Sequence, residues 1–198
     1  DRLVLTVGYS DPIGAHLYTD TDHASDIFTR KSTTGAALMF EGPITKVSVH
    51  SGAKMQPTVA RSSGEAESVG VDEAVRNLLG IHDDAAGLVH GTSRAVAAMG
   101  VPCIDLAERM GLSFDTKTIR VDASVALTAI TKGFSRVMAY LPKTQGVNLA
   151  FLSEVIENLG FKIEKVHTSA NVADVFTKAV TKSVLAELLP RLGIVQVQ

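Results

Sequence analysis

Four acidic residues stand in short motifs spread along the chain and could bind divalent metal ions together. They are Asp20 in LYTDTDHASD, Glu67 in RSSGEAESVGVDEAV, Asp122 in TIRVDASVALTAI and Asp174 in NVADVFTK. Carboxylates that a fold brings together raise one another's pKa unless a cation offsets their charge. Mg²⁺ and Mn²⁺ are hard ions that prefer oxygen ligands. The pattern therefore indicates metal-assisted phosphodiester hydrolysis.

Two of these acids can be separated from their acidic neighbours by periodicity. Asp20 lies in the middle of an expected strand over 16–22, whereas Asp22 on the same side is explained equally well by exposure at a strand edge. Glu67 extends a buried helical series through Val71, so it is expected to face the sheet, while Glu65 is expected on the polar side. The structural alternative for either glutamate is a favourable charge in the first turn of a helix.

The other two acids have stronger structural alternatives. Asp122 ends an apolar strand where a helix begins, so it could be a plain N-cap, yet open α/β sheets also build sites at the carboxyl ends of strands. Asp174 could be only a first-turn acid favoured by the helix dipole. The sequence has no histidine pair at zinc-type spacing, no GxSxG motif and no glycine-rich phosphate loop. These absences favour metal chemistry over the usual nucleophilic alternatives.

Hydrophobic periodicity predicts a mixed sheet covered by helices. We expect one domain over 1–198, with a lead-in segment at 1–14 that includes a strand at 3–10, and a helical connector over 85–117. Further strands are expected at 16–22, 35–41, 44–50, 118–122 and 162–168. Helices are expected from Ser63 onward and at 93–99, 104–110, 124–131, 147–159 and 173–189.

Composition is that of an ordinary globular protein: 198 residues, 45% hydrophobic and 20% charged. A single cysteine, Cys103, excludes an intrachain disulfide and supports no cysteine-based zinc site. Neither a membrane-length apolar run nor a signal peptide is evident, so an intracellular location without a membrane partner is expected. The start at Asp1 rather than methionine predicts that the chain is cut from a longer polypeptide.

The net charge of −2 argues against binding nucleic acid by bulk electrostatics alone. Local basic clusters could still flank a groove, or they could be solvated surface charges. They comprise Arg30 with Lys31, Lys46 with Lys54, Lys132 with Arg136, and Lys143.

Read together, four segments resemble the ribonuclease H domain of copia-type retrotransposon polyproteins, from about Tyr9 to the end. They are TDTDHASDIFTRKSTTGAALMFEG, KMQPTVARSSGEAES, RVDASVALTAI and NVADVFTKAV. The resemblance implies a ribonuclease-H-like α/β fold with a mixed five-stranded sheet flanked by helices. It also implies that Asp20, Glu67, Asp122 and Asp174 hold two Mg²⁺ or Mn²⁺ ions. Asp11 is excluded from the first motif, because only Asp20 lies at the right distance from RKSTTG.

The same resemblance implies an endonuclease that hydrolyses the RNA strand of RNA·DNA hybrids during reverse transcription. One metal ion would activate water and the other would stabilise the leaving 3′-oxygen, giving 5′-phosphate and 3′-hydroxyl ends. Candidate substrate contacts are Ser32, Thr33, Gln56 and Gly64. The expected partners are the hybrid and an upstream reverse transcriptase domain of the same polyprotein, in the cytoplasm, a virus-like particle or the nucleus.

Three departures from the family pattern keep other interpretations open. His23 stands where tryptophan is usual, Ser68 replaces an aromatic residue, and Lys143-Thr144-Gln145 replaces a Lys-His stretch. One alternative is a noncatalytic ribonuclease-H-like module that positions a polymerase. Another is a different nuclease of this fold, integrase-like or structure-specific.

Overall fold

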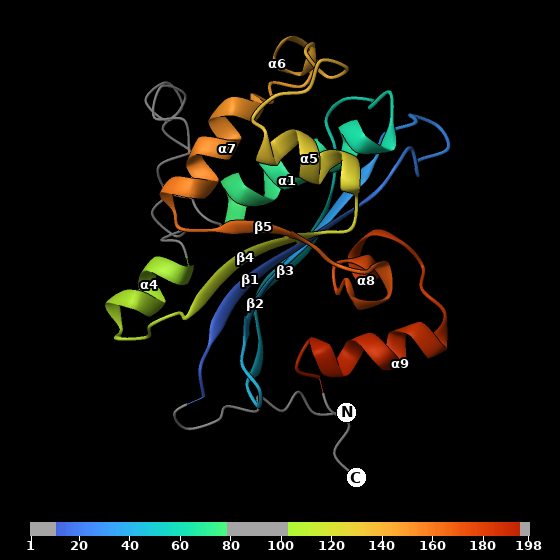
Figure 1. Cartoon of the computed structure of the whole chain (residues 1–198). Coiled ribbons are helices and arrows are strands. Elements are labelled where there is room, and N and C mark those ends of the chain that lie inside the picture. Colours follow the sequence, from blue (N-terminus) through green and yellow to red (C-terminus); the bar gives the residue numbers. More distant parts are fainter. Residues whose placement is uncertain (1–10, 79–102, 195–198) are drawn as a thin grey trace, which may run out of the picture.

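A five-stranded sheet runs through the centre of the computed structural model, which describes residues 11–78 and 103–194 (Figure 1). Its strands are β1 (Gly14–Asp22), β2 (Thr33–Glu41), β3 (Lys46–Met55), β4 (Thr116–Val121) and β5 (Lys162–Lys165). They lie in the order β3-β2-β1-β4-β5. The first three form an antiparallel meander, and β4 and β5 join it in parallel. The predicted mixed sheet is confirmed.

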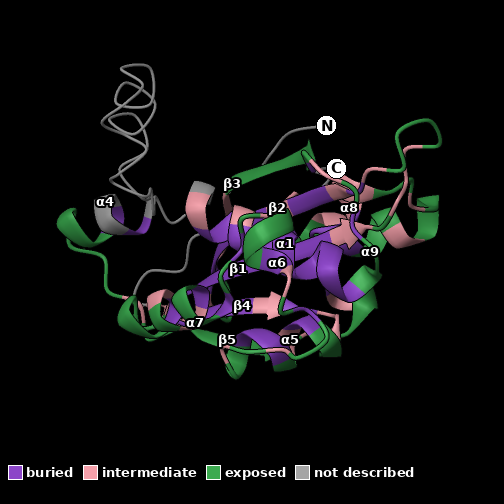
Figure 2. Cartoon of the chain, turned by 90° about the horizontal axis from the view of Figure 1, so that it is seen from above, coloured by how far each residue is buried: buried purple, intermediate pink, exposed green. Residues whose placement is uncertain are grey.

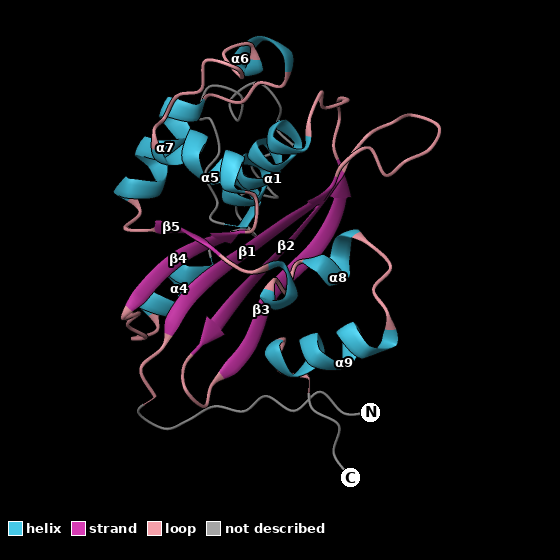
Figure 3. Ribbon diagram, turned by 45° about the vertical axis from the view of Figure 1, so that its right-hand side comes forward, coloured by secondary structure: helices cyan, strands magenta, loops and turns pink. Residues whose placement is uncertain are grey.

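Helices cover both faces of this sheet (Figures 1 and 3). On one face lie α1 (Ser63–Leu78), α5 (Ser124–Thr131) and α7 (Leu149–Asn158). On the other lie the short α8 (Asp174–Thr177) and α9 (Lys182–Arg191). The smaller elements are α4 (Cys103–Arg109), α6 (Leu141–Thr144) and a 3₁₀ turn, Thr168–Ala170. No described helix is long and apolar enough to cross a membrane.

Strand alternation explains why each face is covered. Leu17 and Leu38 point toward α1 and belong to one core cluster, whereas Tyr18 and Met39 belong to the cluster that Leu188 of α9 completes. Successive side chains of a strand point to opposite faces, so a sheet that is apolar on both must be covered on both. Figure 2 shows the resulting buried interior.

The C-terminal third differs most from the sequence prediction. The single helix expected at 173–189 is two helices, because Lys178 adopts an extended backbone (φ −140°, ψ 156°) after α8. The side chain of Thr181 then caps the start of α9. The strand expected at 162–168 ends at Lys165, and the chain continues into the 3₁₀ turn.

Smaller differences concern other boundaries. The strand expected at 44–50 runs from Lys46 to Met55, because its pairing with β2 continues beyond its apolar residues as far as Met55. Helix α6 was not predicted, because one turn is too short to show periodicity. Of the connector expected over 85–117, the described part holds α4 and the start of β4. The predicted strand at 3–10 and helix at 93–99 lie outside the described residues.

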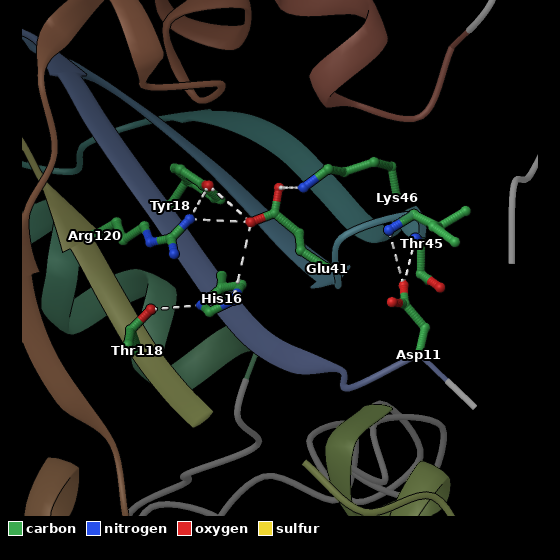
Figure 4. Close-up of polar contacts among 9 residues, drawn as sticks. Asp11, His16, Tyr18, Glu41, Thr45, Lys46, Thr118 and Arg120 are labelled. Carbon is green, nitrogen blue, oxygen red and sulfur yellow. Dashed lines mark hydrogen bonds and ion pairs between the residues drawn. The ribbon is translucent and has the colours of Figure 1, made fainter. Parts of the chain in front are cut away.

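A buried polar cluster ties β1, β2 and β4 together near the end of the sheet opposite to the acids (Figure 4). The Glu41 carboxylate is 8% exposed and lies 3.0 Å from the Arg120 guanidinium and 3.7 Å from the Lys46 ammonium. Tyr18 also donates to Glu41, at 2.9 Å. Burial and the charge of Arg120 lower the pKa of His16 to about 4, so His16 lies near Glu41 as a neutral ring. A cavity of about 700 Å³ separates the cluster from α9.

The burial of Glu41 gives the first prediction. Arg120→Met should lower the free energy of unfolding by about 3 kcal/mol, because removing one partner leaves a buried charge uncompensated. Lys46→Met should cost less than about 1 kcal/mol, because Lys46 is more exposed and more distant. Urea unfolding of both variants measures the difference. Equal costs would show that Arg120 does not balance the charge of Glu41.

Candidate metal centre

Asp20, Glu67 and Asp122 converge at the carboxyl ends of two adjacent parallel strands. Each offers a carboxylate oxygen, and these three oxygens lie within 4.8 Å of one another. Asp20 lies near the end of β1, Asp122 follows β4 directly, and Glu67 comes from the second turn of α1. Parallel pairing of β1 with β4 brings the two aspartates to one edge. This is the place where open α/β sheets form sites.

Asp174 joins this group through Asp20. Asp174 is 5% exposed and, like Asp20, lies within ion-pair distance of Lys178. Lys178 lies between them, with its ammonium 3.6 Å from Asp20 Oδ2 and 3.2 Å from Asp174 Oδ1. The Thr177 hydroxyl also donates to Asp20. All four acids expected from the sequence therefore meet, although Asp174 stands outside the closest three.

The electrostatics of the cluster favour a bound cation. Burial, then Asp20 and Asp122, raise the pKa of Glu67 to about 9. Burial and Asp20 raise the pKa of Asp174 to about 6. Glu67 accepts from the backbone N–H of Thr21 through Oε1, at 3.2 Å, while its buried Oε2 has no hydrogen-bond partner among the described residues. These oxygens fit the hard donor set that Mg²⁺ and Mn²⁺ require.

A pH-dependent cost in stability should therefore accompany Glu67 in metal-free protein. Between the ordinary pKa of 4.5 and about 9, the folded protein keeps a proton that the unfolded chain has released. Stability should fall as pH rises through this window, by at most about 4 kcal/mol between pH 5 and 8. Glu67→Gln should remove that slope, because its amide oxygen still accepts from Thr21.

Urea unfolding in EDTA at several pH values measures this prediction. Saturating Mg²⁺ or Mn²⁺ should flatten the slope of the wild-type protein and leave Glu67→Gln almost unchanged. Parallel pH profiles for the two proteins in EDTA would contradict it.

The structure excludes the N-cap alternative for Asp122, and its role as a metal ligand stays a prediction. The N-cap of α5 is Ala123, and no side chain caps that helix. Asp122 instead accepts a hydrogen bond from the Thr168 hydroxyl at 2.9 Å. Its carboxylate therefore points toward the 3₁₀ turn and the other acids rather than toward the helix that follows.

The expected substrate contacts fit this geometry less well. Ser32 is fully buried, and its Oγ accepts from the N–H of Ala24 at 3.1 Å. Gln56 is 1% exposed and donates to Thr34 Oγ1 and to the Ala66 carbonyl. Direct contact of these two side chains with a duplex does not fit their burial. Gly64 is also buried, against Val125, and Thr33 is half-buried, so both stay predictions.

Glu65 is a correction to the helix-face argument. Instead of lying on a polar surface it is 1% exposed. It accepts from the backbone N–H of Arg61, the Tyr140 hydroxyl and the Gln145 amide. The distant segment 140–145 covers it, which helical periodicity within α1 could not reveal. Sequence reasoning also missed Thr168, Thr177 and Lys178 as neighbours of the acids, although Lys178 follows Asp174 at helical spacing.

Comparison with known proteins supports the resemblance. No family model matches the chain. The retrovirus-related Pol polyprotein from transposon TNT 1-94 of Nicotiana tabacum is 25% identical over 181 residues, which are 90% of this chain and 11% of that protein. The chain thus spans about a tenth of the length of this relative. It resembles a segment of a retrotransposon Pol polyprotein.

Two solved structures are also similar. One is RNase H1 from the halophilic archaeon Halobacterium salinarum NRC-1, with a TM-score of 0.48 and 17% identity over 82% of this chain and 93% of that one. The other is LC11-RNase H1 in complex with RNA/DNA hybrid, with a TM-score of 0.49 and 10% identity over the same shares. The strand order and parallel pairings of the chain itself agree with the fold that the resemblance implied. The fold is an α/β fold with a mixed five-stranded sheet flanked by helices.

Proposed function

We propose that this chain is a metal-dependent endonuclease that hydrolyses the RNA strand of RNA·DNA hybrids during retrotransposon reverse transcription. The observation that carries the proposal is the convergence of Asp20, Glu67 and Asp122 within 4.8 Å, on an edge where β1 and β4 end. The similarity to a Pol polyprotein supports the setting. Buried carboxylates this close destabilise the protein unless protons or cations offset their charge. A metal ion bound among them would offset that charge.

The chemistry follows from the donor set. Asp20, Glu67, Asp122 and Asp174 would hold two Mg²⁺ or Mn²⁺ ions. Bound there, such ions would supply an activated water and stabilise charge on the leaving 3′-oxygen, giving 5′-phosphate and 3′-hydroxyl ends. Thr168 would orient Asp122, and Thr177 would orient Asp20, through the hydroxyl hydrogen bonds already described. Lys178 balances part of the acidic charge.

Substrate choice would depend on the RNA strand. We propose that contacts to 2′-hydroxyls across the wide minor groove distinguish RNA from DNA, with little dependence on sequence. Thr33 and the backbone near Gly64 are the remaining candidates for such contacts. The chain would act beside an upstream reverse transcriptase domain of the same polyprotein, inside the cell, in the cytoplasm or a virus-like particle, or in the nucleus.

A noncatalytic module is the rival function, and the three departures from the family pattern motivate it. The structure accommodates two of them without disturbing the acids. The His23 ring lies 3.2 Å from the carbonyl of Ala60, and the Ser68 hydroxyl donates to the carbonyl of Gly64 at 2.8 Å. In the third departure, Lys143-Thr144-Gln145, the side-chain amide of Gln145 donates a hydrogen bond to Glu65. Because these polar groups have partners and all four acids are present, we favour the enzyme.

Cleavage of a labelled RNA·DNA hybrid tests the proposal. Labelled duplex RNA and duplex DNA of the same sequence are the comparison substrates. Each substrate is incubated separately with Mg²⁺, Mn²⁺ or EDTA. We expect metal-dependent loss of the hybrid RNA alone. Cleavage of duplex DNA would indicate another nuclease of this fold, and hybrid binding without cleavage in either metal would indicate the noncatalytic module.

A further inference from the structure

The loop between β1 and β2 displays two large apolar side chains. Ile27 is 75% exposed and Phe28 is 89% exposed. Figure 1 shows this loop, in blue at the upper right, extending beyond the sheet. A single exposed hydrophobic residue needs no explanation. Two adjacent ones at the tip of a loop form an apolar surface that folding does not require, and such surfaces mark interaction sites.

Internal hydrogen bonds hold this tip in one shape. The Asp26 carboxylate accepts from the backbone N–H groups of Phe28 at 2.9 Å and Thr29 at 2.6 Å. The Asp26 backbone also bonds Arg30 and Lys31 across the turn. Ala24 and Arg30 have left-handed backbones, with φ of 53° and 58°. Non-glycine residues adopt this region at a cost, and such strain persists where the surroundings fix the conformation.

The base of the loop is attached to the segment that carries the acids. Ser32 Oγ accepts from the N–H of Ala24, and the Ser32 carbonyl accepts from the N–H of Gln56 at 2.8 Å. The Gln56 amide in turn donates to the carbonyl of Ala66 at 2.8 Å, one residue before Glu67. The loop begins after Asp22, the last residue of β1, so only two residues separate it from Asp20. The tip and the acidic cluster are therefore positioned by one connected set of bonds.

Charge around the tip favours a polyanionic partner. Arg30 is exposed and Lys31 is half-buried, and neither forms an ion pair within the part of the chain that the structure describes. The nearby Asp26 carboxylate is already used by two backbone N–H groups, which hold its pKa below the usual value. Lys31 also lowers the pKa of Asp26 through its charge, after the hydrogen bonds from Thr29 and Phe28. An exposed aromatic side chain beside cations is a combination that nucleic-acid-binding proteins use.

We propose that Ile27 and Phe28 form an apolar contact with the hybrid substrate. The two side chains pack against sugar and base surfaces in the shallow minor groove, while Arg30 and Lys31 contact the adjoining phosphates. The proposal deepens the proposed function and rests on hybrid binding, but it does not depend on cleavage. Because the sugars that line the minor groove are common to all sequences, the contact depends little on sequence.

Fluorescence anisotropy with a labelled RNA·DNA hybrid tests this contact. The parent is the full chain carrying Asp122→Asn, in Mg²⁺, so that the hybrid stays intact. Ile27→Ser with Phe28→Ser should raise the Kd about 10-fold, because both changes remove apolar surface that the contact would bury. Arg30→Gln should reduce the salt slope of log Kd by about 1. Met110→Ser is the matched control, since Met110 is 77% exposed on another part of the molecule.

The outcomes separate this inference from the proposed function. A weakened double variant with an unchanged control and unchanged thermal unfolding supports the contact, even where the wild-type chain does not cleave. Equal Kd values for parent and double variant overturn it, whatever the wild-type activity. If the double variant binds the hybrid with the same Kd as the parent but, unlike the parent, no longer self-associates in sedimentation, the tip is a protein interface and the proposal is wrong. Failure of the parent to bind any hybrid also overturns it.

Discussion

Asp122→Asn should reduce hybrid cleavage by about 1,000-fold or more while leaving the fold intact. A catalytic metal ion stabilises the transition state by several kcal/mol, and each 1.36 kcal/mol changes a rate tenfold. Asparagine removes a negative charge that, in the proposed function, would hold the ion. Its amide oxygen can still accept from the Thr168 hydroxyl, which Asp122 now does at 2.9 Å. Because Asp122 does not cap α5, little stability should be lost with the carboxylate.

The measurement is the initial rate of RNA cleavage in a labelled hybrid, in Mg²⁺ and in Mn²⁺, beside thermal unfolding of the same protein. Asp22→Asn is the matched control: it changes an equally small acidic side chain on β1 that lies outside the three converging oxygens. The control should stay within about 3-fold of wild type, since a surface charge contributes little. Activity above a tenth of wild type in folded Asp122→Asn would exclude the acidic cluster as the catalytic centre.

Local patterns predicted the parts of this site that depend on one element at a time. Its place in the middle of the expected strand separated Asp20 from Asp22, and helical spacing placed Glu67 with Val71 and Ala74, which are 0% and 3% exposed. The strand-to-helix boundary at Asp122 was visible because this polar residue directly follows an apolar strand, and α5 begins two residues later. Hydrophobic periodicity and the ends of helices and strands depend on short segments of the chain, so they can be predicted from a single sequence.

Features that depend on distant segments were not predictable in this way. The burial of Glu65 requires Tyr140 and Gln145, which lie at the two ends of α6. Gln56, which directly follows β3, is likewise buried where its side chain bonds to α1. In both cases polar side chains looked available for solvent or substrate, although the fold uses them to join segments. Resemblance to a family supplied the order of motifs, but not these internal contacts.

Gly35→Ala should displace Asp174 without altering any acid, and we expect a loss of cleavage of about 10- to 100-fold. A Cβ at Gly35 would lie 2.9 Å from the carbonyl oxygen of Ala173 and 2.6 Å from Thr177 Cγ2. The Ala173 contact is with backbone, so α8 must move away from β2. A misplacement of about 1 Å near a reacting centre can cost a hundredfold in rate. The midpoint temperature of thermal unfolding should also fall, since overpacking costs about 1–3 kcal/mol of stability.

Gly52→Ala is the control that isolates this steric effect. Gly52 lies in β3 opposite Ala36, next along β2 from Gly35, and a Cβ there would meet nothing within 4 Å. Both substitutions add one methyl group to a strand glycine, so a general effect on strand formation would appear in both. Loss of activity in Gly35→Ala alone, with weaker Mn²⁺ binding by calorimetry, would show that α8 must rest against β2 for Asp174 to serve the centre. Full activity in Gly35→Ala would mean that the enzyme does not need Asp174 at this position, and three acids would then suffice.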